Sequence, residues 1–271
     1  MTKIRLSPSL LAAARACAGR CRKVTRVWRI GRRAAAAIAA VLIGAALAAP
    51  AVLLAPLDAG GNAPAAPWQV IGFPFQAKPL THFDIVAIDS RRALRVEADQ
   101  SYGILNHPLS GIGSGAHQLS WRWRVDVPND KADLREWSGD DVAAEVCVGF
   151  DLPLDRVPFL DRQSLRAARL ASKAEVPAAE VCYVWDSHLP TGTAIDSVFT
   201  RRVRRIVVRG AGTPVAAWRS ETRDVDADFM RLFGEEARQV PPIIAVAVAA
   251  DADNTRARTV AYVADVVLAQ R

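Results

Sequence analysis

The chain has 271 residues, of which 51% are hydrophobic and 23% charged, with a formal net charge of +7. This composition excludes a disordered chain, a collagen, a disulfide miniprotein and a polytopic membrane protein. The positive charge is confined to one end: residues 1–33 hold ten Lys and Arg and no acid, whereas the chain from Asp58 onward holds 25 basic and 28 acidic residues, a balance of −3. We therefore expect no nucleic-acid partner.

An uncharged run of 24 residues, 34–57, follows the basic segment. As a helix rising about 1.5 Å per residue it is long enough to cross a membrane, and the preceding basic residues would hold the N-terminal end in the cytoplasm. The run is either a signal peptide, cut near Ala46-Leu47-Ala48 or Ala49-Pro50-Ala51, or an uncleaved anchor. Both readings predict an exported, periplasmic protein, released after cleavage or held at the inner membrane by residues 34–57.

A short segment without periodicity, 58–67, comes next and is rich in Gly, Ala and Pro. Such a composition is typical of a flexible linker. The remaining 204 residues, 68–271, are enough for one domain with a substantial core.

This body of the chain has the pattern of β-strands. Residues 120–127 alternate strictly, with Trp121, Trp123 and Val125 on one face and charged residues on the other. Further short apolar runs predict strands at 83–88, 93–98, 142–150, 181–185, 203–208, 215–222, 243–249 and 260–268. Two helices are expected, at about 161–173 and 226–237, the second capped by Asp224 or Asp226. The order favours an all-β, antiparallel, jelly-roll-like sandwich with one or two short helices.

Two acidic segments are the best candidate site. Asp140 and Asp141 open a strand that also carries Glu145, and Asp251, Asp253 and Asn254 end another strand, where we expect a hairpin. Clustered carboxylate and amide oxygens can bind Ca²⁺, here through Asp251, Asp253 and Asp140. They can instead bind sugar hydroxyls, share a proton as an acid–base pair, or cap nearby backbone N–H groups in Asx turns. The sequence leaves these alternatives open.

Other patterns are weaker. The glycine-rich stretch 111–115 precedes a strand, so it is interpreted as a turn and not as a dinucleotide-binding loop. Most tryptophans have strand-face spacing and belong in a core, whereas Trp137 lies in a polar run and could form an aromatic platform for a sugar. Four basic residues form a stripe on the first expected helix, either solvated or directed at an anionic surface: Arg162, Arg166, Arg169 and Lys173.

A short echo links the segments 144–151 and 179–186, which share the sequence Ala-Glu-Val-Cys. It suggests two neighbouring strands. In an oxidising compartment Cys147 and Cys182 could then form a disulfide that closes a loop of about 35 residues.

The ordered set of motifs resembles the bacterial domain-of-unknown-function family 3047, a family of exported proteins. The resemblance rests on residues 119–126, 139–141, 183–185, 202–208, 218–224, 228–234, 241–243, 251–255 and 262–265. The resemblance implies an exported protein with the same architecture. The acidic positions that recur in the family correspond here to Asp140, Asp141, Asp251 and Asp253. The segment 155–176 is interpreted as an insertion, and the two cysteines depart from the family pattern.

Two functions follow from these observations. The first is an envelope binding module for a glycan or another envelope component, with Ca²⁺ at the acidic loops. The alternative is a hydrolase or lyase of an envelope polymer that uses a carboxylate of Asp140, Asp141 or Glu145. A domain that contacts only a protein partner is a third possibility.

Overall fold

The computed structural model describes residues 51–59, 61–72, 77–113, 115–172 and 175–270. The basic segment 1–33 and most of the apolar run, residues 34–50, lie outside the described residues, as do Cys17 and Cys21. Within the described part of the chain, no helix is both long and apolar enough to cross a membrane. The described residues, from Ala51 onward, belong to a single compact unit.

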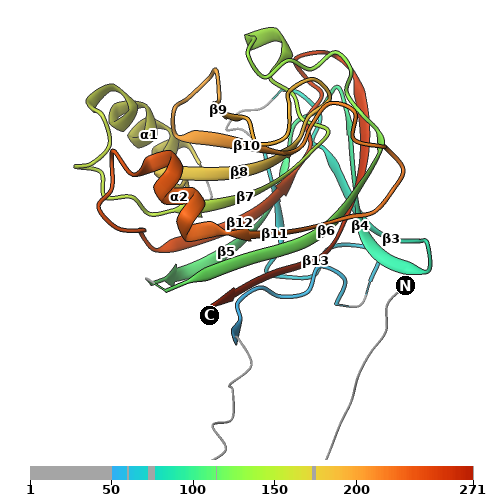
Figure 1. Cartoon of the computed structure of the whole chain (residues 1–271), viewed down its shortest axis with the longest axis horizontal. Helices are drawn as coiled ribbons and strands as arrows, with labels where there is room; N and C mark the ends of the chain where they lie inside the picture. Colours follow the sequence, from blue (N-terminus) through green and yellow to red (C-terminus); the bar gives the residue numbers. More distant parts are fainter. Residues whose placement is uncertain (1–50, 60, 73–76, 114, 173–174, 271) are drawn as a thin grey trace, which may run out of the picture. The chain divides into compact units, whose positions relative to one another are not determined.

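Two β-sheets make up this body, as the sequence pattern predicted (Figure 1). In the first sheet the strand order is β11-β6-β13-β4-β3, and β1 pairs with β13; in the second it is β2-β5-β12-β7-β8-β10-β9. The strands of the first sheet are β1 (Ala51–Val52), β3 (His82–Ile88), β4 (Arg91–Asp99), β6 (His117–Val127), β11 (Arg219–Asp224) and β13 (Arg258–Gln270). Those of the second are β2 (Gln69–Ile71), β5 (Ile104–Ile112), β7 (Ala144–Phe150), β8 (Ala179–Trp185), β9 (Ala194–Asp196), β10 (Val203–Arg209) and β12 (Ile243–Ala249).

Alternating side chains join the two sheets across the core. Trp121 and Trp123 of β6 are 0–1% exposed and contact aromatic rings of the second sheet. The ring centroids of Trp121 and Tyr183 lie 5.3 Å apart, and those of Trp123 and Trp185 lie 5.7 Å apart. Period-2 alternation therefore predicted the inward face of β6 correctly.

The echoed segments are β7 and β8, which lie side by side and pair antiparallel with Cys147 opposite Cys182. The next strand, β10, departs from the predicted antiparallel order because it pairs parallel to β8. The connection between them, 186–202, is long enough to cross back, and it adds β9 at the sheet edge.

Strand β5 was not predicted. Its polar residues Asn106 and His107 break the apolar alternation, and Gly111, expected in a turn, lies near its end with a φ of 70°. The expected hairpin at residues 251–255 is also wrong. This loop joins β12 in one sheet to β13 in the other, so it crosses between the sheets instead of closing a hairpin.

Three short helices complete the domain: η1 (Trp137–Gly139), α1 (Phe159–Ala171) and α2 (Val225–Phe233). Helix α2 begins at Asp224, whose side chain accepts a hydrogen bond of 2.9 Å from the backbone N–H of Ala227, as an N-cap does. Its Phe229 packs on Phe150 of β7, with ring centroids 4.5 Å apart. Helix α1 lies within the segment 155–176, which the sequence led us to interpret as an insertion, and buries only Leu165.

The last residues of the run predicted as a signal peptide or anchor, 51–57, contact the sandwich. Leu54 and Leu57 are buried in the core, and the backbone N–H of Leu53 donates to the carbonyl of Leu268. The backbone N–H of Ala55 donates to Nε2 of His107 over 3.0 Å, so the His107 ring accepts through this nitrogen. This segment therefore contributes a strand and two core side chains to the fold.

Candidate functional site

The outer face of the second sheet, turned away from the other sheet, is hollowed into a groove. Small side chains explain the hollow: β12 alternates inward valines with outward Ala247 and Ala249, and the neighbouring strands place Cys147 and Cys182 there. The groove has two adjoining parts, of about 520 and 360 Å³. A few residues line both parts and mark their junction: Tyr102, Ile104, Glu180, Thr200 and Val203.

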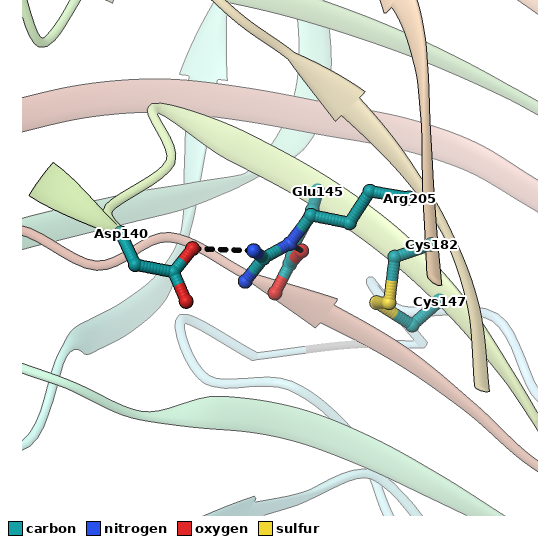
Figure 2. The surroundings of a disulfide bond; sticks show 5 residues. All are labelled: Asp140, Glu145, Cys147, Cys182 and Arg205. Carbon is teal, nitrogen blue, oxygen red and sulfur yellow. Dashed lines mark hydrogen bonds and ion pairs between the residues drawn. A yellow bond between two sulfur atoms is a disulfide. The ribbon is translucent and has the colours of Figure 1, made fainter. Parts of the chain in front are cut away.

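The larger part of the groove contains a buried arginine between two acids (Figure 2). The guanidinium of Arg205 donates a hydrogen bond to Asp140, and its Nε lies 3.6 Å from a carboxylate oxygen of Glu145. Asp140 also accepts a 3.0 Å hydrogen bond from the hydroxyl of Ser197. The side chain of Arg205 is only 7% exposed, and its Nε has no hydrogen-bond partner among the described residues.

Glu180 lies at the junction of the two parts of the groove. Burial and the nearby negative charge of Glu145 raise the pKa of Glu180 to about 7. Burial also raises the pKa of Glu145, against the opposing effect of Arg205. In the part of the chain that the structure describes, no group donates a hydrogen bond to the Glu180 carboxylate, so this group is available to a ligand.

The two predicted acidic segments meet at one end of the groove. The carboxylate of Asp141 accepts hydrogen bonds from the backbone N–H groups of Asn254 (3.1 Å) and Thr255 (2.7 Å), and from the Thr255 hydroxyl. Asp251 accepts from the backbone N–H of Val142 over 2.6 Å. These acids therefore connect the loop before β7 to the loop after β12.

The sequence also suggested that these acids bind a cation. One carboxylate oxygen each from Asp141, Asp251 and Asp253 lies within 4.8 Å of the others. Asp140, which the sequence placed in this set, instead directs its carboxylate at Arg205, and Asp141 takes its place. Each of the three carboxylates already accepts a hydrogen bond, Asp253 from Lys78. Burial, Glu145 and Asp141 raise the pKa of Asp251 well above its ordinary value.

Two exposed aromatic rings border the groove. Phe199 lines its larger part and is 52% exposed, and Trp137 is 66% exposed. Their ring centroids lie 4.7 Å apart. Contact between two apolar rings and water is unfavourable in a protein without a ligand. This pair therefore marks a surface suited to an apolar or sugar-ring contact.

Cys147 and Cys182 form a disulfide in the floor of the groove (Figure 2). The bond joins β7 to β8 between the positions of Glu145 and Glu180. It therefore fixes the two strands that carry these acids.

The residues that sequence reasoning missed here are Glu180, Arg205 and Tyr102. The echo contained a signal for the first, because Glu145 and Glu180 each stand two residues before a cysteine and so share its face. Nothing in the sequence marked Arg205 among its basic neighbours. In the predicted basic stripe, Arg162 and Arg169 donate to the carbonyls of Val157 and Val176, and Lys173 lies outside the described residues.

Comparison with known proteins gives a family and a distant fold likeness. Residues 66–267 match the family model described as protein of unknown function (DUF3047). No curated protein matches the chain. Similar solved structures include the carbohydrate-binding module TmCBM61 in complex with β-1,4-galactotriose (10% identity, TM-score 0.35, covering 82% of this chain and 99% of that one).

Two further structures have comparable scores. One is the CBM22-1–CBM22-2 tandem domain of Paenibacillus barcinonensis Xyn10C (11% identity, TM-score 0.37, 83% of this chain and 51% of that one). The other is Trichoderma harzianum endoglucanase 3 of family GH12 (8% identity, TM-score 0.34, 75% of this chain and 97% of that one). Likenesses at this level carry no argument about the ligand.

Proposed function

The chain belongs to the DUF3047 family of proteins of unknown function, and we propose that it is a cell-envelope protein that binds a glycan in the groove of its second sheet. One observation carries the proposal: the groove combines buried acids that still have hydrogen-bonding capacity with the exposed ring pair Trp137 and Phe199 at its edge. Sugar hydroxyls donate to carboxylates, and sugar C–H faces pack on aromatic rings.

The charge of the groove favours a neutral glycan over an anionic one. Five acids line the larger part: Asp140, Glu145, Glu180, Asp251 and Asp253. Of the two described cations that line this larger part, Arg205 is engaged by Asp140 and Glu145, and Lys78 pairs with Asp253. An anionic polymer would therefore find no unpaired cation among these residues to offset its own charge, which costs free energy in a partly buried groove.

Export is part of this proposal, and the disulfide supports it. Disulfides persist in oxidising compartments such as the bacterial periplasm and are rare in the cytoplasm. The Cys147–Cys182 bond lies in the domain that the apolar run 34–57 would send across the membrane. Because residues 51–57 of this run belong to the folded domain, an anchor or a cleavage site would lie before them, and either is compatible with binding an envelope glycan.

The acidic loops carry a smaller part of the proposal. We propose that Asp141 acts mainly as a cap for the 251–255 loop, because its two oxygens already accept three hydrogen bonds. Ca²⁺ takes six to eight oxygen ligands, and it would have to use the remaining lone pairs of Asp251 and Asp253. A melting curve with added Ca²⁺ tests this: we expect a shift within about 1 °C, and a larger, saturable rise would establish a cation site.

Binding itself is tested with the full chain by affinity electrophoresis on gels that contain neutral β-glucan, galactan or xylan, with polygalacturonate as the anionic comparison. We expect retardation by at least one neutral polymer. Trp137→Ala should weaken it about fivefold, because an aromatic contact contributes on the order of 1 kcal/mol. Trp218→Ala is the matched control, since this indole lies against Arg91 on the other sheet. Retardation by none of the neutral polymers would refute the proposal.

A further inference from the structure

We propose that the groove also cleaves the glycan it binds, by hydrolysis, with Glu180 as the general acid and Glu145 as the general base. This inference rests on the proposed function and deepens it. It differs from the enzyme suggested by the sequence, because Asp140 and Asp141 are engaged by protein groups while Glu180 is not.

The position of Glu180 is the first observation. It lines both parts of the groove, so a chain of sugars that fills the two parts must pass over this carboxyl. A bond between two sugars, one in each part, would lie at the junction. A general acid must be within hydrogen-bond reach of the bridging oxygen, and the junction is the place that provides this reach.

The unpaired polar atoms of the larger part are the second observation. Oε2 of Glu145 and Nε of Arg205 are buried and have no hydrogen-bond partner among the described residues. Both side chains line the groove. The two atoms face each other over 3.6 Å as an ion pair, too far apart for a hydrogen bond, so a water molecule or ligand hydroxyl that bridges them would satisfy both.

The surroundings of the two acids assign their roles. Arg205 lies beside Glu145 and opposes the rise in its pKa that burial causes, so Glu145 is the acid of the two that has a cation next to the ionised form that a base requires. Glu180 has no cation within ion-pair distance among the described side chains, and burial raises its pKa to about 7, so near neutral pH a large fraction carries the proton that an acid must donate.

The reaction is a hydrolysis with water as the second reactant. Glu180 gives its proton to the bridging oxygen while the bond from that oxygen to the anomeric carbon breaks, and the bonding electrons stay with the oxygen. Glu145 takes a proton from a water molecule, whose oxygen bonds to the anomeric carbon. Two shorter glycans leave, and proton exchange with solvent restores both acids.

Strand register predicts the stereochemistry. Glu145 pairs with Val184 and Glu180 with Gly149, so the two acids are four residues apart along the ladder, about 13 Å between their backbone positions. Carboxylates about 5 Å apart form a covalent intermediate, whereas a wider separation leaves room for water. The proposal therefore predicts inversion at the anomeric carbon, since two glutamate side chains that start this far apart leave room for a water molecule between them. Elimination is disfavoured, since it would need a cation free to bind a uronate carboxylate.

The experiment measures new reducing ends and binding in parallel, with the full chain and each neutral polymer that it retards. We expect cleavage that slows as pH rises through about 7, and Glu180→Gln should reduce the rate at least about 100-fold while retardation persists. Glu235→Gln, an exposed acid outside the groove, is the matched control and should cleave normally.

The outcomes separate the two proposals. No retardation of the wild-type chain overturns the binding function. Retardation without cleavage, or equal cleavage by Glu180→Gln and wild type, overturns the hydrolase and leaves binding standing. If Glu180→Gln loses binding as well, circular dichroism and melting decide whether it is folded. A folded variant without binding overturns the role of Glu180 as an acid, and for an unfolded one Glu145→Gln is tested by the same criteria.

Discussion

Replacing Asp141 by Asn tests whether the acidic loops are joined by hydrogen bonds or need another partner. The substitution keeps size and shape but leaves one acceptor oxygen instead of two. In the better orientation the amide oxygen faces Thr255 and retains two hydrogen bonds, while the NH₂ group faces the backbone N–H of Asn254. The cost is one unsatisfied N–H, about 1–3 kcal/mol, plus the loss of charge assistance in the remaining bonds, about 1 kcal/mol.

We therefore expect Asp141→Asn to lower the free energy of unfolding by about 2–4 kcal/mol, measured by urea denaturation with an unchanged m-value. Asp265→Asn is the matched control: it makes the same chemical change at an exposed ion pair with Arg91, and Asn tolerates the positive φ of this residue. The control should lose less than about 1 kcal/mol. Equal losses in the two variants would refute the capping role of Asp141.

Three further predictions concern stability. Replacing Cys147 and Cys182 by alanine should cost about 3–4 kcal/mol, measured against the oxidised wild type by denaturation, because the bond closes a loop of 35 residues; no loss would mean that the bond does not constrain the unfolded chain. The pKa of Glu180 rises from 4.5 to about 7 on folding, so between these pH values the folded state binds more protons than the unfolded state. The free energy of unfolding should therefore fall by up to about 3 kcal/mol as pH rises through this window. The fall should be smaller in Glu180→Gln, and an equal fall in that variant would exclude Glu180 as the cause of the pH dependence. Burial lowers the pKa of His107, so below about pH 6.5 the unfolded state binds more protons than the folded state. Acid should therefore release residues 51–57, and the Ala55 amide, which donates to His107, should exchange its hydrogen faster. An exchange rate that does not depend on pH, after correction for the intrinsic rate, would contradict this prediction.

Periodicity and turn chemistry were enough to predict most strands, and they placed Trp121 and Trp123 in the core. They failed at β5, because Asn106 and His107 are polar yet buried, and burial there depends on partners distant in the chain, such as the Ala55 amide for His107. The parallel pairing of β8 and β10 was also invisible, since strand direction within a sheet is set by tertiary contacts and not by local alternation.

The candidate site was predictable only in part. The sequence identified the two acidic segments that meet beside the groove, because consecutive acids at strand ends stand out from apolar neighbours. It could not show which carboxylates are already engaged: Asp140 and Asp141 are adjacent in sequence but face Arg205 and Thr255 respectively. Glu180 is flanked by apolar residues, so only the pairing of the echoed strands reveals that it shares a face with Glu145.

The alternation of Ala and Val in β12 has a consequence for how such a domain can change its specificity over time. The valines are committed to the core, whereas Ala247 and Ala249 contribute only a methyl group each to the floor of the groove. Exchanging either alanine for a larger residue would make the floor shallower without removing a core contact. Recognition can therefore diverge at these two positions while the inward face of the strand, and with it the fold, stays under separate selection.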